Sequence, residues 1–229
     1  MKSRFAAVFG AMALLAACGS TQQSAAPPQA SSFLPREAVS LLVPSDSGSR
    51  LYINPNVDLR RYTRVMVEPV QLWLVPGHAA LSTEQRQVVA NAFYAALREE
   101  LGRDLQLVER PGPGTMVIGT AIREAREGGN PVLSTVSTFV PVTRLAREGA
   151  NLMTGSDPMV GGAAAEMKIT DSETGQLLAA AIDSRDATAG ARARTSSWDD
   201  VQFVVRYWAA QTAFRLCRVQ QRPNCRAAA

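Results

Sequence analysis

A helical pattern between Ser82 and Gly102 is the strongest folding signal in this sequence. Ser82 and Gln85 fit a capping box, in which each side chain hydrogen-bonds the backbone amide of the other residue. Apolar residues then recur at helical spacing, at Val89, Ala92, Phe93, Ala96, Leu97 and Leu101. Gly102 is expected to end the helix as a residue in the left-handed conformation.

Strand patterns lie on both sides of this helix. Alternating or continuous apolar residues predict strands over 64–68, 70–75, 105–109, 116–125, 163–170 and 177–183. Pro69 predicts a bend between the first two, since a proline interrupts the hydrogen bonding of a ladder. The strand over 116–125 starts apolar on both faces and is expected to be central. Residues 171–175 predict a hairpin turn with Gly175 in the left-handed conformation.

A second helix is predicted to begin after a cap at Ser197. Two apolar stripes follow it, one at Val201, Val204, Val205, Trp208 and Thr212, the other at Phe203, Tyr207, Ala210, Phe214 and Cys217. Two stripes predict a broadly buried helix. Residues 130–153 leave a helix and a strand open, because their apolar residues fit a helix, their Ser, Thr and Val content favours a strand, and Pro141 disfavours the interior of either. The expected fold is α/β (α+β): a single domain over 51–229, with a mostly antiparallel mixed sheet and two main helices packed on one face.

The N-terminal residues have the pattern of an export signal. Lys2 and Arg4 precede an apolar run over 5–15, and Ala16 and Ala17 stand directly before Cys18, as in a bacterial lipobox. Residues 1–17 are therefore expected to be a signal peptide, with Cys18 lipidated as the first mature residue. Three acyl chains would anchor the protein stably in a membrane. The alternative is an ordinary signal peptide cut near Ala17, which leaves Cys18 a plain thiol.

Gly19 follows the cysteine in place of the aspartate that retains bacterial lipoproteins in the inner membrane. The expected location is therefore the periplasmic side of the cell outer membrane. Residues 18–50 are expected to form a lipidated, flexible tether, whose reach as a coil over 19–50 is about 30 Å. Apolar residues near its end are candidates for docking on the domain: Phe33, Leu34, Leu41, Leu42 and Val43.

Setting Cys18 aside leaves Cys217 and Cys225 as an even pair in an exported protein, which predicts a disulfide after the last helix. A redox-active pair is the alternative, but the spacing lacks the C-x-x-C pattern. No motif predicts a cofactor or a metal site. The single histidine, His78, lies in a loop without a catalytic motif, and the glycines at 112, 114, 161 and 162 lack the lysine of a phosphate-binding loop.

Charge gives a weak indication of partners. The formal net charge of +4 includes Lys2 and Arg4 of the signal, so the balance does not predict binding to nucleic acid. Arginines exceed acids in the last 45 residues, which is compatible with an anionic lipid or an acidic partner, or with scattered solvated side chains. These arginines are Arg185, Arg192, Arg194, Arg206, Arg215, Arg218, Arg222 and Arg226.

Several separated pieces in the right order resemble a family of bacterial lipoproteins known as domain-of-unknown-function family 3313. They are residues 52–58, 65–70 with Trp73, 109–114, 130–138, 171–175, Trp198, Tyr207-Trp208 and Leu216-Cys217. The resemblance implies a lipoprotein and brings no activity.

We therefore expect a non-enzymatic outer-membrane lipoprotein whose periplasmic domain binds or scaffolds another envelope component. One alternative is a periplasmic enzyme that uses carboxylates, with Glu68 as its candidate residue. A second alternative is a carrier of a small apolar ligand held beneath residues 130–143.

Overall fold

The computed structural model describes residues 21–23, 32–46, 48–73, 83–126, 162–187 and 199–228. In chain order, its elements are β1 (Thr21–Gln23), α1 (Arg36–Ser40), β2 (Val43–Pro44), β3 (Arg50–Ile53), the 3-10 helix η1 (Leu59–Arg61), β4 (Arg64–Val67), β5 (Gln71–Leu72), α2 (Thr83–Gly102), β6 (Gln106–Leu107), β7 (Thr115–Arg126), β8 (Gly162–Asp171), β9 (Leu177–Ala187) and α5 (Asp199–Val219).

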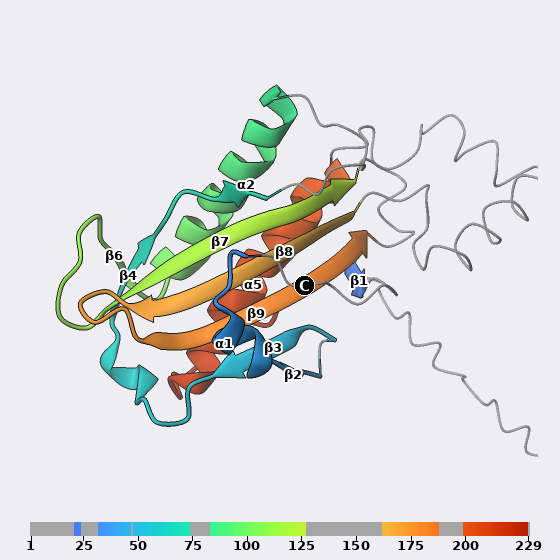
Figure 1. Ribbon diagram of the computed structural model, residues 1–229. Helices are drawn as coiled ribbons and strands as arrows, with labels where there is room; N and C mark the ends of the chain where they lie inside the picture. The colour runs from blue at the N-terminus through green and yellow to red at the C-terminus, as the bar shows by residue number, and fades with distance from the viewer. Residues whose placement is uncertain are drawn as a thin grey trace, which may run out of the picture.

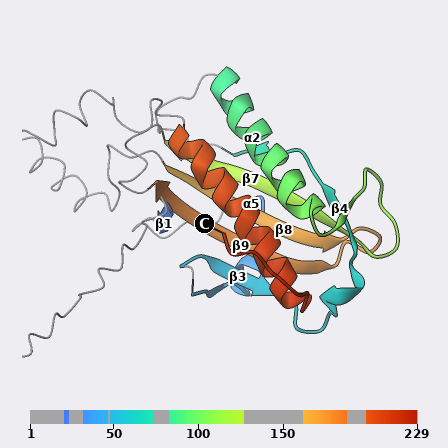
Figure 2. The ribbon, with the colours of Figure 1, turned by 180° about the vertical axis from the view of Figure 1, so that it is seen from behind.

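The strands form one mixed, 9-stranded sheet in the order β2-β3-β9-β8-β7-β4-β6, with β1 also paired to β9 and β5 also paired to β7 (Figure 1). The pairs β2-β3, β3-β9, β1-β9, β8-β9 and β7-β8 are antiparallel, whereas β4 and β5 run parallel to β7, and β6 runs parallel to β4. The two long helices α2 and α5 lie side by side on one face of the sheet (Figure 2). The predicted fold class is thereby confirmed.

The main core fills the space between these helices and the sheet. The ring centroids of Phe93 on α2 and Trp208 on α5 lie 5.8 Å apart, and strand residues such as Met116 and Ile118 are fully buried beneath them. On α5, the stripe that contains Trp208 is buried, except for Thr212. The second stripe is only half-buried as far as Phe214, so the helix is less completely buried than the two stripes predicted.

A smaller core covers the opposite face of the sheet. Phe33, Leu34 and Leu42, together with Ala38 of α1, pack against β7 and β9, and Figure 1 shows α1 in front of β9. Leu41 and Val43 stay exposed. The expectation of a coil throughout residues 19–50 is therefore wrong for residues 21–23 and 32–46, because strand pairing and apolar burial hold both pieces on the sheet.

Most predicted strands are present. β4 ends at Val67 and β5 begins at Gln71, and both pair with β7, so the strand is interrupted around Pro69. β7 lies between β4 and β8, which confirms its central position. Gly175 has a φ of 71°, the left-handed conformation predicted for the hairpin turn. Residues 130–153 and the predicted caps at Ser82 and Ser197 lie outside the described residues.

Gly102 plays a different role from the one predicted. It belongs to the last turn of α2 and is not among the residues with positive φ. A Cβ at this position would lie 2.9 Å from Cδ1 of Leu107. The missing Cβ leaves room for the Leu107 side chain of β6 against the end of the helix, and the helix does not end in a left-handed residue at Gly102.

The predicted disulfide is confirmed: Cys217 and Cys225 are joined, with their Cα atoms 5.6 Å apart. Cys217 lies in the last turns of α5, so the bridge folds the C-terminal residues back on the helix. Gln220, inside this loop, donates from Nε2 to the backbone oxygens of Leu59 at 2.8 Å and Tyr62 at 2.7 Å. The C-terminal end of α5 is thus fixed to the 3-10 helix that precedes β4.

Candidate binding groove

An apolar groove lies between the C-terminal half of α5 and the sheet. Its walls are Leu51 and Ile53 of β3, Met167 and Ile169 of β8, and Leu216 and Val219 of α5. The cavity volume is about 50 Å³, and the groove is open to solvent. Most of these side chains are half-buried, so an apolar group can reach them from outside.

The groove exists because small residues stand on β9 below the helix. Ala179, Ala180 and Ala181 all line it, and Ala180 also belongs to the smaller core near α1. Their single methyl groups cannot fill the space between strand and helix as a leucine would. The strand sequence Leu177–Ala181 therefore produces a hollow where a sheet would otherwise pack against a helix.

A basic group stands at the polar end of the groove. Nη2 of Arg215 donates to Oγ of Ser49 at 2.8 Å and to Oγ of Ser45 at 3.4 Å. Burial lowers the pKa of Arg215 from its ordinary value, while the nearby carboxylate of Asp183 acts in the opposite direction. At any physiological pH the guanidinium keeps its charge, so a positive group is held next to an apolar surface.

A second hollow adjoins the first and shares Met167, Ala181, Thr212 and Arg215 with it. Asp183 and Trp208 line it, and Oδ2 of Asp183 accepts from Nε1 of Trp208 at 2.9 Å and from Nε of the buried Arg185 at 2.8 Å. The guanidinium of Arg185 also lies 4.4 Å from the centre of the Tyr207 ring. These contacts join α5 to β9 at this end of the groove.

The carboxylates near the groove do not converge on one point. Glu166 also borders the second hollow, but it lies between Ala165 and Met167 of the main core, so its side chain points to the opposite face. There its Oε1 lies 3.2 Å from Nε of Arg123. Asp183 and Glu166 are therefore separated by the sheet, and they cannot act as a general acid–base pair on one substrate.

Glu68, the candidate of the carboxylate hypothesis, lies on the face opposite the long helices. A Cβ on Gly119 would be 2.8 Å from its Oε2 and 3.3 Å from Cε of Lys168. Both side chains thus pass over the glycine of β7, and the Lys168 ammonium also lies 4.8 Å from the centre of the Phe33 ring. The structure brings Glu68 next to a lysine rather than next to a second carboxylate.

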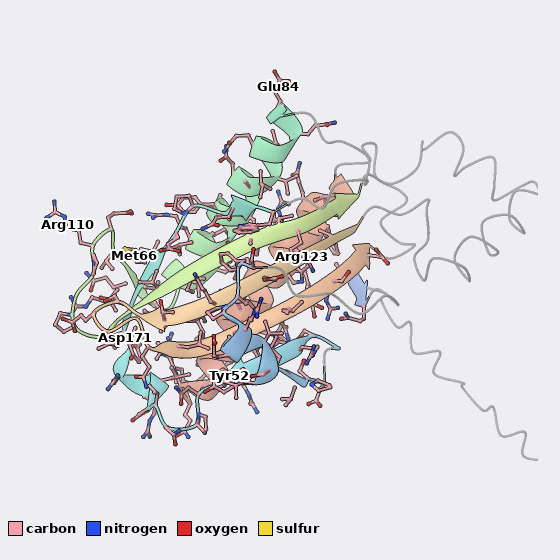
Figure 3. All side chains as sticks on the ribbon, in the orientation of Figure 1. Tyr52, Met66, Glu84, Arg110, Arg123 and Asp171 are labelled. Atoms are coloured by element: carbon pink, nitrogen blue, oxygen red, sulfur yellow. A yellow bond between two sulfur atoms is a disulfide. The ribbon has the colours of Figure 1, made fainter. Side chains whose placement is uncertain are left out.

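A third polar cluster is at the opposite end of the sheet from β1. Oδ2 of Asp171 accepts from the Tyr62 hydroxyl at 2.7 Å, and its Oδ1 accepts from the amides of Glu173 and Thr174. These hydrogen bonds, that of Tyr62 first, lower the pKa of Asp171 to about 2. Figure 3 shows Asp171 and Arg110 at this same end. The cluster stabilises the β8–β9 turn and leaves the carboxylate fully engaged.

The C-terminal arginines that the structure describes differ in their exposure. Arg185 is buried, Arg215 is held by the two serines, and Arg222 donates from Nη1 to the backbone oxygen of Asp104 at 2.9 Å. Arg206, Arg218 and Arg226 are exposed, and Arg192 and Arg194 lie outside the described residues. The excess of arginines is visible in the sequence, whereas the burial of Arg185 and the hydrogen bonds of Arg215 and Arg222 depend on the folded chain.

Other predicted sites cannot be placed. Cys18, His78, Gly161 and residues 130–143 lie outside the described residues. In the part of the chain that the structure describes, no group of three or more His, Cys, Asp or Glu side chains could hold a metal ion. Among the same residues, no helix combines the length and the apolar character needed to cross a bilayer. The groove itself was not predicted; its only sequence signal is the alanine run at 179–181.

Comparison with known proteins gives a family and a distant structural likeness. A variant of the PelC dodecamer from Paraburkholderia phytofirmans is similar to this chain with a TM-score of 0.41 and 11% identity, covering 77% of this chain and 98% of the other. The PelC dodecamer in a second crystal form gives a TM-score of 0.38 and 11% identity, covering 69% of this chain and 92% of the other. No curated protein sequence matches the chain significantly. The profile of a protein family of unknown function, DUF3313, matches residues 29–212, and the chain belongs to that family.

Proposed function

We propose that this protein is an outer-membrane lipoprotein, anchored through Cys18, whose periplasmic domain binds another protein of the envelope in the groove beneath α5. The observation that carries the binding role is the groove itself, which combines half-buried apolar walls with the fixed guanidinium of Arg215. Such a surface suits an apolar side chain with an acidic group beside it. The anchor is supported by the lipobox sequence that ends at Cys18.

The geometry favours binding over carboxylate catalysis. Asp183 is already bonded to Arg185 and Trp208, and Glu166 lies on the other side of the sheet. A carrier role for a small apolar ligand is favoured by the same apolar walls, but a groove open along one side does not surround a ligand as carrier cavities do. The proposed occupant is therefore a side chain presented by a partner protein.

The anchor is tested by Cys18→Ser. In cells that export and process the protein, the wild type should fractionate with outer membranes, and the variant should appear in the soluble periplasmic fraction. Mass spectrometry of the wild type should show an N-terminal mass that includes the acyl chains. A variant that still fractionates with the membrane would contradict the proposal.

The binding role is tested with a photoreactive amino acid at Leu51, in the groove, and at Val88, an exposed position on α2. Irradiation in living cells should give a discrete protein adduct from position 51 and not from position 88. Ala181→Leu fills the groove and should abolish that adduct, whereas Ala95→Leu, the same change on an exposed part of α2, should leave it. Adducts of equal yield at both positions, or an adduct that survives Ala181→Leu, would refute the site. An adduct with lipid alone would favour the carrier role instead.

A further inference from the structure

The N-terminal segment contributes a strand to the sheet only three residues after Cys18. Thr21–Gln23 forms β1, which pairs antiparallel to the end of β9, with Thr21 opposite Ala187 and Gln23 opposite Arg185. Thr21 is buried, with 7% of its surface exposed, and Nη1 of Arg185 lies 3.4 Å from its Oγ1. The Gln23 side chain packs against Gly48, where an added Cβ would come within 2.9 Å of it. This segment is thus part of the folded domain.

The pairing has a physical reason. β3 covers the outer edge of β9 only over Ala179–Ile182, and β9 continues for five more residues. An uncovered strand edge exposes unpaired backbone groups, which proteins usually cover or pair. β1 pairs with the exposed part of this edge at 185–187, and so it completes the sheet at the place where β3 ends.

This placement shortens the predicted tether severely. Only three peptide steps separate Cys18 from Thr21, and even fully extended they span about 11 Å. A coil over 19–50 would reach about 30 Å. An acyl anchor on Cys18 would therefore hold the edge of the sheet at the level of the lipid headgroups.

The direction of β1 decides which end of the domain is held there. Thr21, the residue of β1 nearest to Cys18, lies opposite Ala187, the last residue of β9. Cys18 therefore lies beyond the end of the sheet where β7 and β9 finish and β8 begins (Figure 1). The β8–β9 turn lies at the other end, about 34 Å away along the 11 residues of β9. Gly48 contacts Gln23, so the residues between β2 and β3 that the structure describes, Asp46 among them, are near the anchored end.

We infer that the domain rests on the lipid surface with the β1 end against the headgroups, while the β8–β9 turn points away from the membrane. This inference rests on the proposed acylation of Cys18. A long tether would allow the domain to take many orientations relative to the membrane, whereas the short connection to β1 favours one. The lipid-facing surface is the end of the sheet at β1 and at the finish of β7 and β9.

The test uses the full-length, acylated protein in phospholipid vesicles that contain lipids with a nitroxide on the headgroup. A fluorophore is attached to Asp46→Cys, near the anchored end, or to Glu173→Cys, in the β8–β9 turn; both positions are exposed. Since Cys217 and Cys225 form a disulfide and Cys18 carries lipid, the new cysteine is labelled selectively. Quenching should be severalfold stronger at position 46 than at position 173. Equal quenching at both positions would overturn the inference.

Two insertions separate a docked β1 from a merely short tether. A twelve-residue Gly/Ser segment, with a root-mean-square length of about 20 Å, is placed either after Ser20 or after Gln23. Both lengthen the chain between Cys18 and Phe33 equally. The first should remove the quenching at position 46, whereas the second should preserve it, because β1 stays between the anchor and the sheet. The same effect from both insertions would show that β1 is not docked.

A last measurement does not depend on the lipid. In the soluble Cys18→Ser form, Thr21→Cys combined with Ala187→Cys should form a disulfide in the oxidising periplasm, since the two residues are opposed. Thr21→Cys combined with Glu173→Cys should not. Failure of the first pair to cross-link overturns the docking of β1. If the protein with Cys18 intact fails to float with vesicles, while the pair still cross-links in the Cys18→Ser form, the acyl anchor and the membrane orientation are overturned but β1 remains docked.

Discussion

Asp171 gives the sharpest prediction about stability, because its hydrogen bonds are made only in the folded chain. Its pKa is lowered from 3.8 to about 2, first by the Tyr62 hydroxyl and then by the amides of the turn. A difference of this size between the pKa of Asp171 in the unfolded chain and in the folded chain corresponds to about 2 kcal/mol of unfolding free energy. A lowered carboxyl pKa stabilises the fold fully above the ordinary value near 4. That contribution is lost as the pH falls toward 2.

The perturbation is Asp171→Asn, which keeps a side-chain oxygen for the two amides but does not titrate. Urea unfolding of the soluble Cys18→Ser form, followed by tryptophan fluorescence, gives the free energy at each pH. The wild type should exceed the variant by about 2 kcal/mol at pH 7, and the gap should shrink steeply between pH 5 and pH 2. Glu173→Gln, an exposed change in the same turn, should show no such gap. If the difference in unfolding free energy is absent at pH 7, or unchanged at pH 2, the hydrogen bonds of Asp171 do not stabilise the fold in this way.

Two further predictions concern α5. Trp208→Phe should lower the unfolding free energy by about 1–3 kcal/mol, because the buried Asp183 carboxylate loses its indole donor. Trp73→Phe, at an exposed tryptophan, should change the unfolding free energy far less. Equal effects of the two changes in urea unfolding would contradict the role of the hydrogen bond. Replacing both Cys217 and Cys225 by serine should cost about 2–3 kcal/mol by the loop-closure model, and reductant should lower the wild type by a similar amount without affecting the variant.

Several segments that resemble the family meet at the end of the sheet away from β1. Oγ of Ser172 accepts from the amide of Gly112 at 3.1 Å and donates to the oxygen of the same residue at 3.0 Å. Asn54 donates from Nδ2 to the backbone oxygen of Leu177 at 2.9 Å. The turns at 109–114 and 171–175 and the loop after β3 therefore hold one another in place. For these pieces the structure supplies a structural role, and no catalytic one follows from it.

Local sequence signals predicted much of the fold. The hairpin of β8 and β9, the helix α2, the interruption at Pro69 and the disulfide all depend on residues close together in the chain. Their patterns, such as alternation, helical spacing and paired cysteines, express the geometry of a single element. The fold class followed from the order of these elements.

Tertiary contacts decided the rest. The position of Gly102 is explained by Leu107 of a neighbouring strand, and Arg215 is held by serines about 170 residues earlier in the chain. The groove depends on which helix lies above the alanines of β9, and the docking of β1 depends on how far β3 extends along the same edge. Patterns of neighbouring residues along the chain specify which elements form, because those patterns reflect the geometry of a single helix, strand or turn. Only the packed structure decided which side chains are buried and where surfaces remain open, since those depend on residues that meet only after folding.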